Sequence, residues 1–213
     1  MPVRCALWLL LVAPTWALQA DAELLFATPT LAGTLSARSW KSLRDERVVK
    51  QEFDFSCGAA SLATVLQSFY GRKVAEGTLL EAMGKTDAAS FDDMARVLPQ
   101  FGFKAVGVAI SFDQLSRLKI PAVVHLRLRD QEHFSVVRGV GKGLVWLADP
   151  SWGNRRLSQA RFLAMWETRE PESPKGRALL VLPSSVPAST KPDFFGKPGS
   201  FELPVEMLSL RLL

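Results

Sequence analysis

Four residues of this chain have the side chains needed for thiol chemistry. Cys57 stands at the start of an apolar helical pattern, and Gln51 precedes it by six positions (57 − 51 = 6). His133 lies far downstream, and Asp149 follows it by 16 positions (149 − 133 = 16). A cysteine nucleophile, an imidazole base, a carboxylate that orients the base and an amide that stabilises an oxyanion make up an acyl-transfer site. The four residues therefore predict a thiol acyl-transfer enzyme that acts on a peptide carbonyl.

The position of Cys57 suits a nucleophile. The free N–H groups and the dipole of a first helical turn favour an anion. The backbone N–H of Cys57 and the side-chain amide of Gln51 could donate to an oxyanion, and Gly58 would let a substrate backbone come close. Taken alone, Cys57 could equally be a small buried residue and Gln51 a solvated loop residue. Their occurrence together with a distant histidine and aspartate favours a site.

The histidine and the aspartate are expected at one end of a hairpin. His133 opens a strand, and Asp149 ends the next one, in Leu-Ala-Asp-Pro. If the glycine-rich stretch 141–143 closes the hairpin, the two side chains lie near each other at its open end. Asp149 could then orient the imidazole of His133. An Asp before a proline is also a common turn former, and Asp149 alone would fit that interpretation as well.

Two other features of the sequence could suggest a metal ion or a nucleotide, but neither supports a cofactor. His125 lies in the middle of a strand pattern, which favours a half-buried structural residue over a base that must reach the sulfur. Two histidines without a close cluster of further ligands are weak support for a metal site. The run Gly-Val-Gly-Lys-Gly at 139–143 lies between two strands and opens no helix, so it predicts a turn and not a phosphate-binding loop.

Composition limits the remaining classes of function. The 213 residues are 48% hydrophobic and 22% charged, which suits one globular domain with extensions. The net charge is +5, but the basic residues are scattered and many have acidic neighbours. No basic stripe is interleaved with aromatic residues, so nucleic acid is not an expected partner.

The first 20 residues are typical of a secretory signal peptide. Arg4 precedes a short apolar run at 6–13, and small residues follow at Ala17, Ala20 and Ala22. The run is shorter than the roughly 20 apolar residues that a membrane span needs, although an uncleaved anchor is the alternative interpretation. We therefore expect an exported, periplasmic protein with no transmembrane helix after cleavage.

Signal cleavage would leave one thiol in the mature chain. Cys5 lies within the signal peptide, so Cys57 would be the remaining cysteine and could form no internal disulfide. A single thiol in an exported protein is explained either by pairing between chains or by reactivity. Together with its surroundings, this favours a reactive Cys57.

Hydrophobic periodicity predicts an α+β fold. We expect residues 21–45 to form an N-terminal arm, 46–182 the main domain, and 183–213 a Pro-rich linker and a C-terminal tail. The expected helices cover residues 57–70, 76–83, 90–101, 111–118 and 158–166. The expected strands cover residues 104–110, 122–128, 133–140, 144–149 and 177–182.

The motifs resemble those of one known family. Gln51 followed by Cys57-Gly58, then Tyr70-Gly71, the run His-Phe-Ser-Val-Val from His133, and Asp149-Pro150 are similar to the bacteriocin-processing, double-glycine-leader cysteine peptidases. The resemblance covers roughly residues 46–170. It implies a papain-like fold, in which N-terminal helices carrying the cysteine pack on an antiparallel sheet carrying the histidine and the aspartate. It also implies that Cys57 is the nucleophile, His133 the base, Asp149 the orienting group and Gln51 part of the oxyanion hole.

The sequence departs from the family pattern in two ways, at the residue before the cysteine and in the domains that accompany the peptidase. The family commonly has Asp directly before the nucleophile, where this chain has Ser56. Members of the family usually front a transporter, whereas this chain resembles the stand-alone, exported members encoded with functional-amyloid secretion systems. That resemblance implies a periplasmic endopeptidase that processes a leader peptide, amyloid subunits or secretion-system proteins for biofilm.

Two non-enzymatic alternatives remain open at this stage. The same groove could hold a secreted peptide without cutting it, or the tail at 183–213 could make the protein an assembly factor of a secretion complex. The presence of all four site residues favours the enzyme. A peptidase that is self-sufficient would keep its activity after deletion of the tail.

Overall fold

The computed structural model describes residues 22–28, 31–37, 39–128, 131–166, 175–185 and 189–196. The expected signal peptide and the last 13 residues, 201–213, lie outside this part. The chain divides into two compact units, residues 1–40 and 41–213. In the first unit, β1 (Ala22–Thr28) and β2 (Leu31–Ala37) form an antiparallel hairpin within the segment expected to be an arm.

The helices lie close to their predicted positions. The predicted helix 57–70 is present as α2 (Cys57–Thr64), which continues directly into the π-helical turn η1 (Val65–Phe69). Gly84 follows α3 in the left-handed conformation at φ 63°, which is typical of a glycine at a helix end. The other helical elements are α1 (Trp40–Arg44), α3 (Glu76–Met83), α4 (Phe91–Val97), η2 (Leu98–Phe101), α5 (Phe112–Arg117), α6 (Gln159–Trp166) and η3 (Pro192–Phe194).

Local sequence signals explain where two of these helices begin. Ser90 and Asp93 form a complete capping box at α4, and Ser111 and Gln114 form another at α5. In each box the serine hydroxyl accepts from a backbone N–H of the first turn, and the third helical side chain accepts from the backbone N–H of the serine. None of the helices in the described part of the chain is long and apolar enough to cross a membrane.

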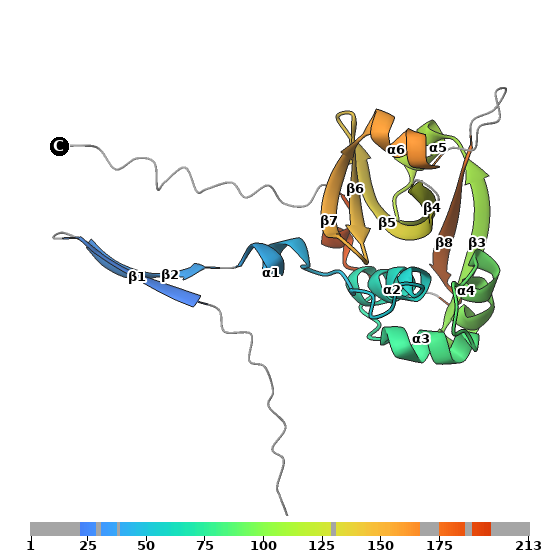
Figure 1. Ribbon diagram of the computed structural model, residues 1–213, viewed down its shortest axis with the longest axis horizontal. Helices are drawn as coiled ribbons and strands as arrows, with labels where there is room; N and C mark the ends of the chain where they lie inside the picture. The colour runs from blue at the N-terminus through green and yellow to red at the C-terminus, as the bar shows by residue number, and fades with distance from the viewer. Residues whose placement is uncertain are drawn as a thin grey trace, which may run out of the picture. The chain divides into compact units, whose positions relative to one another are not determined.

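A six-stranded antiparallel sheet forms the centre of the second unit, with the strand order β3-β8-β4-β5-β6-β7 (Figure 1). The predicted meander of three strands is present as β4, β5 and β6. β7 was missed because its run Gly-Asn-Arg-Arg is polar and lacks the alternation of a half-buried strand. The strands are β3 (Phe103–Ile110), β4 (Ala122–Leu128), β5 (Gln131–Gly141), β6 (Leu144–Asp149), β7 (Gly153–Ser158) and β8 (Gly176–Pro183).

The hairpin between β5 and β6 is closed by a tight turn. Gly141 pairs with Leu144, and the two residues between them, Lys142 and Gly143, have φ values of 50° and 72°. Two consecutive positive φ values are typical of the turn whose twist matches that of the flanking strands. The glycine-rich stretch therefore forms the predicted hairpin turn, and it leaves the start of β5 and the end of β6 at the same end of the sheet.

Apolar residues fill both faces of the sheet. Neighbouring positions on β4 alternate, so Val123 packs in one core and Val124 in the other. The first core lies under α2, α3 and α4, and the second lies under α5 and α6 (Figure 1). This mixed arrangement, with the helix that carries the cysteine packed on β5, is the predicted α+β architecture.

Candidate active site

Cys57 is the first residue of α2, and it lies in the first core with 6% of its surface exposed. The preceding residue, Ser56, uses its hydroxyl to fix the loop before the helix. This hydroxyl donates to the carbonyl of Phe53 at 2.8 Å and accepts from the backbone N–H of Phe53 at 3.1 Å. The loop therefore turns sharply before it delivers the thiol to the helix N-terminus.

Gly58 has a packing role that the sequence did not predict. A Cβ at this position would lie 3.2 Å from the terminal methyl of Met94 on α4 and 3.4 Å from the ring of Phe134 on β5. The absence of a side chain therefore lets α2 approach both elements. The expectation that Gly58 also lets a substrate backbone come close stays a prediction, because this contact concerns only the direction that a side chain would take.

His133 lies between an acid and the thiol. It is 8% exposed on β5, and its Nε2 is 3.2 Å from each carboxylate oxygen of Asp149. Burial opposes the charge on the ring, but hydrogen bonds to Asp149 and Cys57 and their negative charges outweigh it. Together these effects raise the pKa of His133 to about 9. Because Nε2 faces the carboxylate, Nδ1 is the ring nitrogen left for the sulfur.

Asp149 is both a turn former and the partner of His133. It is 1% exposed, and its Oδ1 accepts from the backbone N–H groups of Ser151 at 3.0 Å and Trp152 at 3.1 Å. Burial disfavours its charge, but the hydrogen bond and positive charge of His133, with the two backbone donors, hold the pKa of Asp149 below its usual value. The sequence left open whether Asp149 orients His133 or forms a turn, and in the structure the same carboxylate contacts His133 and the backbone of the turn.

Gln51 joins the loop before α2 to the turn after β6. Its Oε1 accepts from the hydroxyl of Ser151 at 2.6 Å, and its backbone N–H donates to the carbonyl of Pro150 at 3.2 Å. Its Nε2 donates to the carbonyls of Phe53 at 2.9 Å and Asp54 at 3.4 Å. To donate to an oxyanion, this amide must first release one of the two carbonyls.

Glu76 is a buried carboxylate near the site that the sequence did not identify. It begins α3, and its two oxygens accept from the backbone N–H of Glu52 at 3.1 and 3.3 Å. Burial raises its pKa, although a hydrogen bond with Ser56 and the bond from Glu52 oppose the shift. An acid in a first helical turn is common, so its type and position gave no signal.

His125 belongs to β4 and is half-buried. It pairs with Glu132 and packs against the rings of Phe91 and Phe134, with centroids 6.3 and 5.1 Å away. Burial lowers the pKa of His125, and neighbouring positive charges add to the effect while Glu132 opposes it. Within the described residues, no three His, Cys, Asp or Glu side chains gather closely enough to hold a metal ion.

Comparison with known proteins supports what the geometry indicates. Residues 45–169, more than half of the chain, match the model of the peptidase C39 family. The chain belongs to the peptidase C39 family. This C39 peptidase is 36% identical over 213 aligned residues to a Pseudomonas fluorescens protein named "Probable functional amyloid protease FapD", with 92% of each chain covered. It is 34% identical over 145 residues to the protein of the same name from Pseudomonas aeruginosa, with 63% of this chain and 64% of the relative covered.

Solved structures show the same fold. The peptidase domain of Streptococcus ComA, a bifunctional ABC transporter, superposes with a TM-score of 0.55 at 22% identity, over 64% of this chain and 97% of that domain. A double glycine motif protease from an AMS/PCAT transporter, solved with its leader peptide, gives 0.54 at 23% identity, over 64% and 90%. The predicted papain-like fold is confirmed, and the protein is a cysteine peptidase as the sequence predicted.

Proposed function

We propose that this C39 peptidase is an exported, periplasmic thiol endopeptidase that cleaves a polypeptide during functional-amyloid secretion and so serves biofilm formation. The observation that carries the proposal is the position of His133, which is buried between the thiol of Cys57 and the carboxylate of Asp149 with its pKa raised to about 9. An imidazolium beside a thiol at a helix N-terminus favours the thiolate that attacks a carbonyl.

The mechanism follows from this arrangement. The thiolate of Cys57 forms a bond to the carbonyl carbon, and the resulting oxyanion is stabilised by the backbone N–H of Cys57 and the amide of Gln51. His133 gives its proton to the departing amine as the C–N bond breaks, which leaves an acyl-enzyme. Water then attacks the acyl group while His133 accepts its proton, and the thiolate departs as the carboxylic acid product is released. Asp149 keeps the imidazole oriented throughout.

Two findings support the class of substrate. The Pseudomonas relatives are named functional amyloid proteases, and a structural neighbour was solved with a leader peptide. A leader segment or an amyloid subunit exported with this protein is therefore the substrate that we propose. The apolar run after Arg4 supports export to the periplasm, where such a substrate would be met.

The proposal predicts that Cys57→Ala abolishes cleavage and leaves the fold intact, because alanine removes the nucleophile and fits the same small buried volume. The purified protein would be incubated with the proteins encoded beside it, and new termini would be mapped by mass spectrometry. His125→Ala is the matched control, since it changes a histidine outside the mechanism. New termini that appear in equal amount with Cys57→Ala would contradict the proposal.

A further inference from the structure

Part of the expected linker packs on the peptidase unit. Residues 191–196, which we call the C-terminal strap, carry Phe194 as a fully buried member of the first core. Backbone hydrogen bonds hold the strap at both ends. The N–H of Lys191 donates to the backbone carbonyl of Phe69 at 2.6 Å, and the N–H of Gly196 donates to the backbone carbonyl of Arg138 at 2.5 Å. A Cβ on Gly139 would lie 2.9 Å from the carbonyl of Gly196, so β5 has a glycine where the strap passes.

Two arginines hold the strap. The guanidinium groups of Arg47 and Arg138 lie 5.2 and 4.5 Å from the ring centroid of Phe194. Arg47 forms an ion pair with Asp193 at 2.5 Å, and the Nε of buried Arg138 donates to the carbonyl of Phe194 at 3.0 Å. A buried guanidinium without such partners is costly, so the strap and the arginines stabilise one another.

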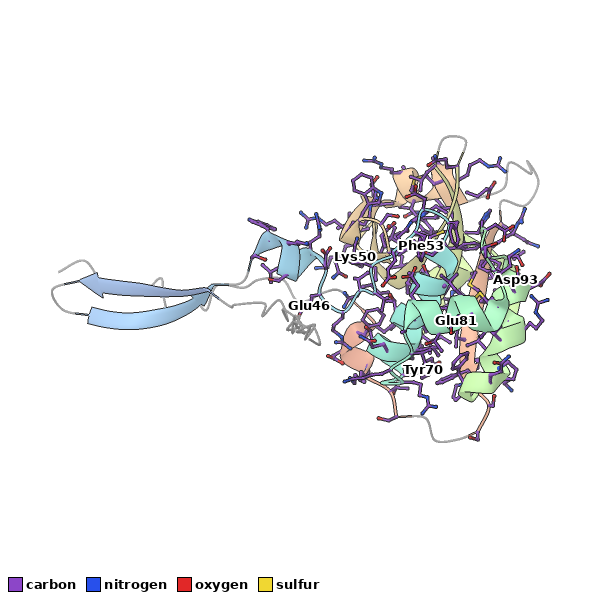
Figure 2. All side chains as sticks on the ribbon, turned by 60° about the horizontal axis from the view of Figure 1, so that its bottom comes forward. Glu46, Lys50, Phe53, Tyr70, Glu81 and Asp93 are labelled. Atoms are coloured by element: carbon purple, nitrogen blue, oxygen red, sulfur yellow. The ribbon has the colours of Figure 1, made fainter. Side chains whose placement is uncertain are left out.

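The same arginines reach toward the active site. Arg138 donates to the Oδ1 of Asn154 at 2.6 Å, and the Nδ2 of Asn154 donates to the carbonyl of Glu46 at 2.7 Å. Arg47 donates to the carbonyl of Ser68 at 2.6 Å, and the hydroxyl of Ser68 donates back to the carbonyl of Arg47 at 2.7 Å. The strap is therefore linked to residues 46–47 and to the start of β7. Figure 2 labels Glu46, Lys50 and Phe53 along the stretch of chain between α1 and α2, which contains residues 46–47.

These two segments lead directly to catalytic side chains. Residues 46–51 end at Gln51, and residues 149–154 begin at Asp149. They touch through the bonds from Gln51 to Pro150 and from Ser151 to Gln51. At Gly153 a Cβ would lie 2.5 Å from Asp45, so the chain just before residue 46 also packs closely on the second segment. Displacing one of them would shift both Gln51 and Asp149.

We propose that the C-terminal strap is a positioning element of the peptidase, which holds the segments of Gln51 and Asp149 in register through Arg47, Arg138 and Asn154. The inference rests on the proposed roles of those two residues. The strap lies beyond residues 45–169, where the family model matches, so it is an addition to the matched region. It also means that deleting the tail removes a core residue, and the loss of activity expected from that deletion would not reveal a partner.

The test compares strap variants of the full chain by hydrogen exchange and by alkylation of Cys57 with iodoacetamide. Phe194→Ala removes the ring that lies against the guanidinium groups of Arg47 and Arg138. The milder Asp193→Asn removes one exposed charge and leaves the core intact. The control is Asp87→Asn, because the Lys85–Asp87 pair has the same exposure, 26% and 75%, as the Arg47–Asp193 pair, 26% and 73%.

We expect exchange in residues 46–51 and 149–154 to rise at least tenfold with Phe194→Ala and severalfold with Asp193→Asn, and to rise less in α3. The alkylation rate per folded molecule should fall in the same order. Unchanged exchange in both segments, or a rise that includes α3 equally, would overturn the proposal. Neither readout needs a cleavage substrate, so failure of the proposed protease function would be seen separately.

Discussion

At the scale of single residues, His133 carries a positive charge at neutral pH because its two partners outweigh the cost of burial. Asp149 and Cys57 both favour the protonated ring, and the pKa of His133 is raised from 6.5 to about 9. This charge contributes stability that is fully present below pH 6.5, where the unfolded histidine is also protonated. The contribution falls as pH rises and is lost above about 9.

The first prediction concerns this pH window. A rise of the pKa from 6.5 to about 9 corresponds to a contribution on the order of 3 kcal/mol to the free energy of unfolding. We expect that free energy, measured by urea denaturation, to decrease between pH 6.5 and 9. His133→Gln should lack most of the decrease. Asp149→Asn should reduce it and keep the turn, since an amide oxygen can still accept from Ser151 and Trp152. Equal slopes in all three proteins would contradict the assignment.

The sequence predicted three site residues that the structure brings together, because each lies at the end of an element. Cys57 begins a helix. His133 and Asp149 lie at the same end of one hairpin, and the glycine-rich sequence of its turn could be recognised in advance. Glu76 could not be predicted, since its partner Glu52 is 24 positions away and nothing local distinguishes it from an ordinary helix-start acid. Its contact exists only after α3 packs beside the loop.

At the scale of elements, signals within a few residues predicted boundaries well, and signals that depend on packing did not. The capping boxes and Gly84 fixed the ends of α3, α4 and α5 because their hydrogen bonds and backbone conformations are local. β7 was missed because pairing with β6, and not its own polar sequence, makes it a strand. The strap was missed because Phe194 packs against residues that are distant in the sequence, such as Arg47.

The second prediction concerns the bond between α3 and the loop before Cys57. Glu76→Ala leaves the backbone N–H of Glu52 without its acceptor, so we expect a loss of about 1–3 kcal/mol in the free energy of unfolding. Glu76→Gln should cost less, because an amide oxygen can accept the same bond without a buried charge. Glu81→Ala, on the exposed face of the same helix (Figure 2), is the control. Similar losses at both positions, measured by urea denaturation, would rule out a special role for Glu76.

At the scale of the whole molecule, the sheet separates two cores that have different relations to the site. The first core contains Cys57 and fully buried Leu62 on α2, and the second contains fully buried Phe162 on α6. A cavity in either core lowers the stability of the whole domain. Only a cavity in the first is next to the helix that begins at Cys57.

The third prediction separates these effects. Leu62→Ala should cost about 2–5 kcal/mol and Phe162→Ala about 3–5 kcal/mol in the free energy of unfolding. We expect Leu62→Ala also to slow alkylation of Cys57 in the folded protein, because α2 loses packing against β5. Phe162→Ala should leave that rate unchanged. If Phe162→Ala slows the reaction as much as Leu62→Ala in fully folded samples, the two cores are not independent.

The most direct test of the contact between the sulfur of Cys57 and the imidazole of His133 is the rate of Cys57 alkylation by iodoacetamide between pH 5 and 9. The proposed mechanism predicts that the wild-type protein reacts rapidly at neutral pH. It predicts that His133→Ala loses this reaction at least tenfold while His125→Ala keeps it, because only His133 can stabilise the thiolate. Identical rates for the two variants would contradict the choice of base and, with it, the proposed mechanism.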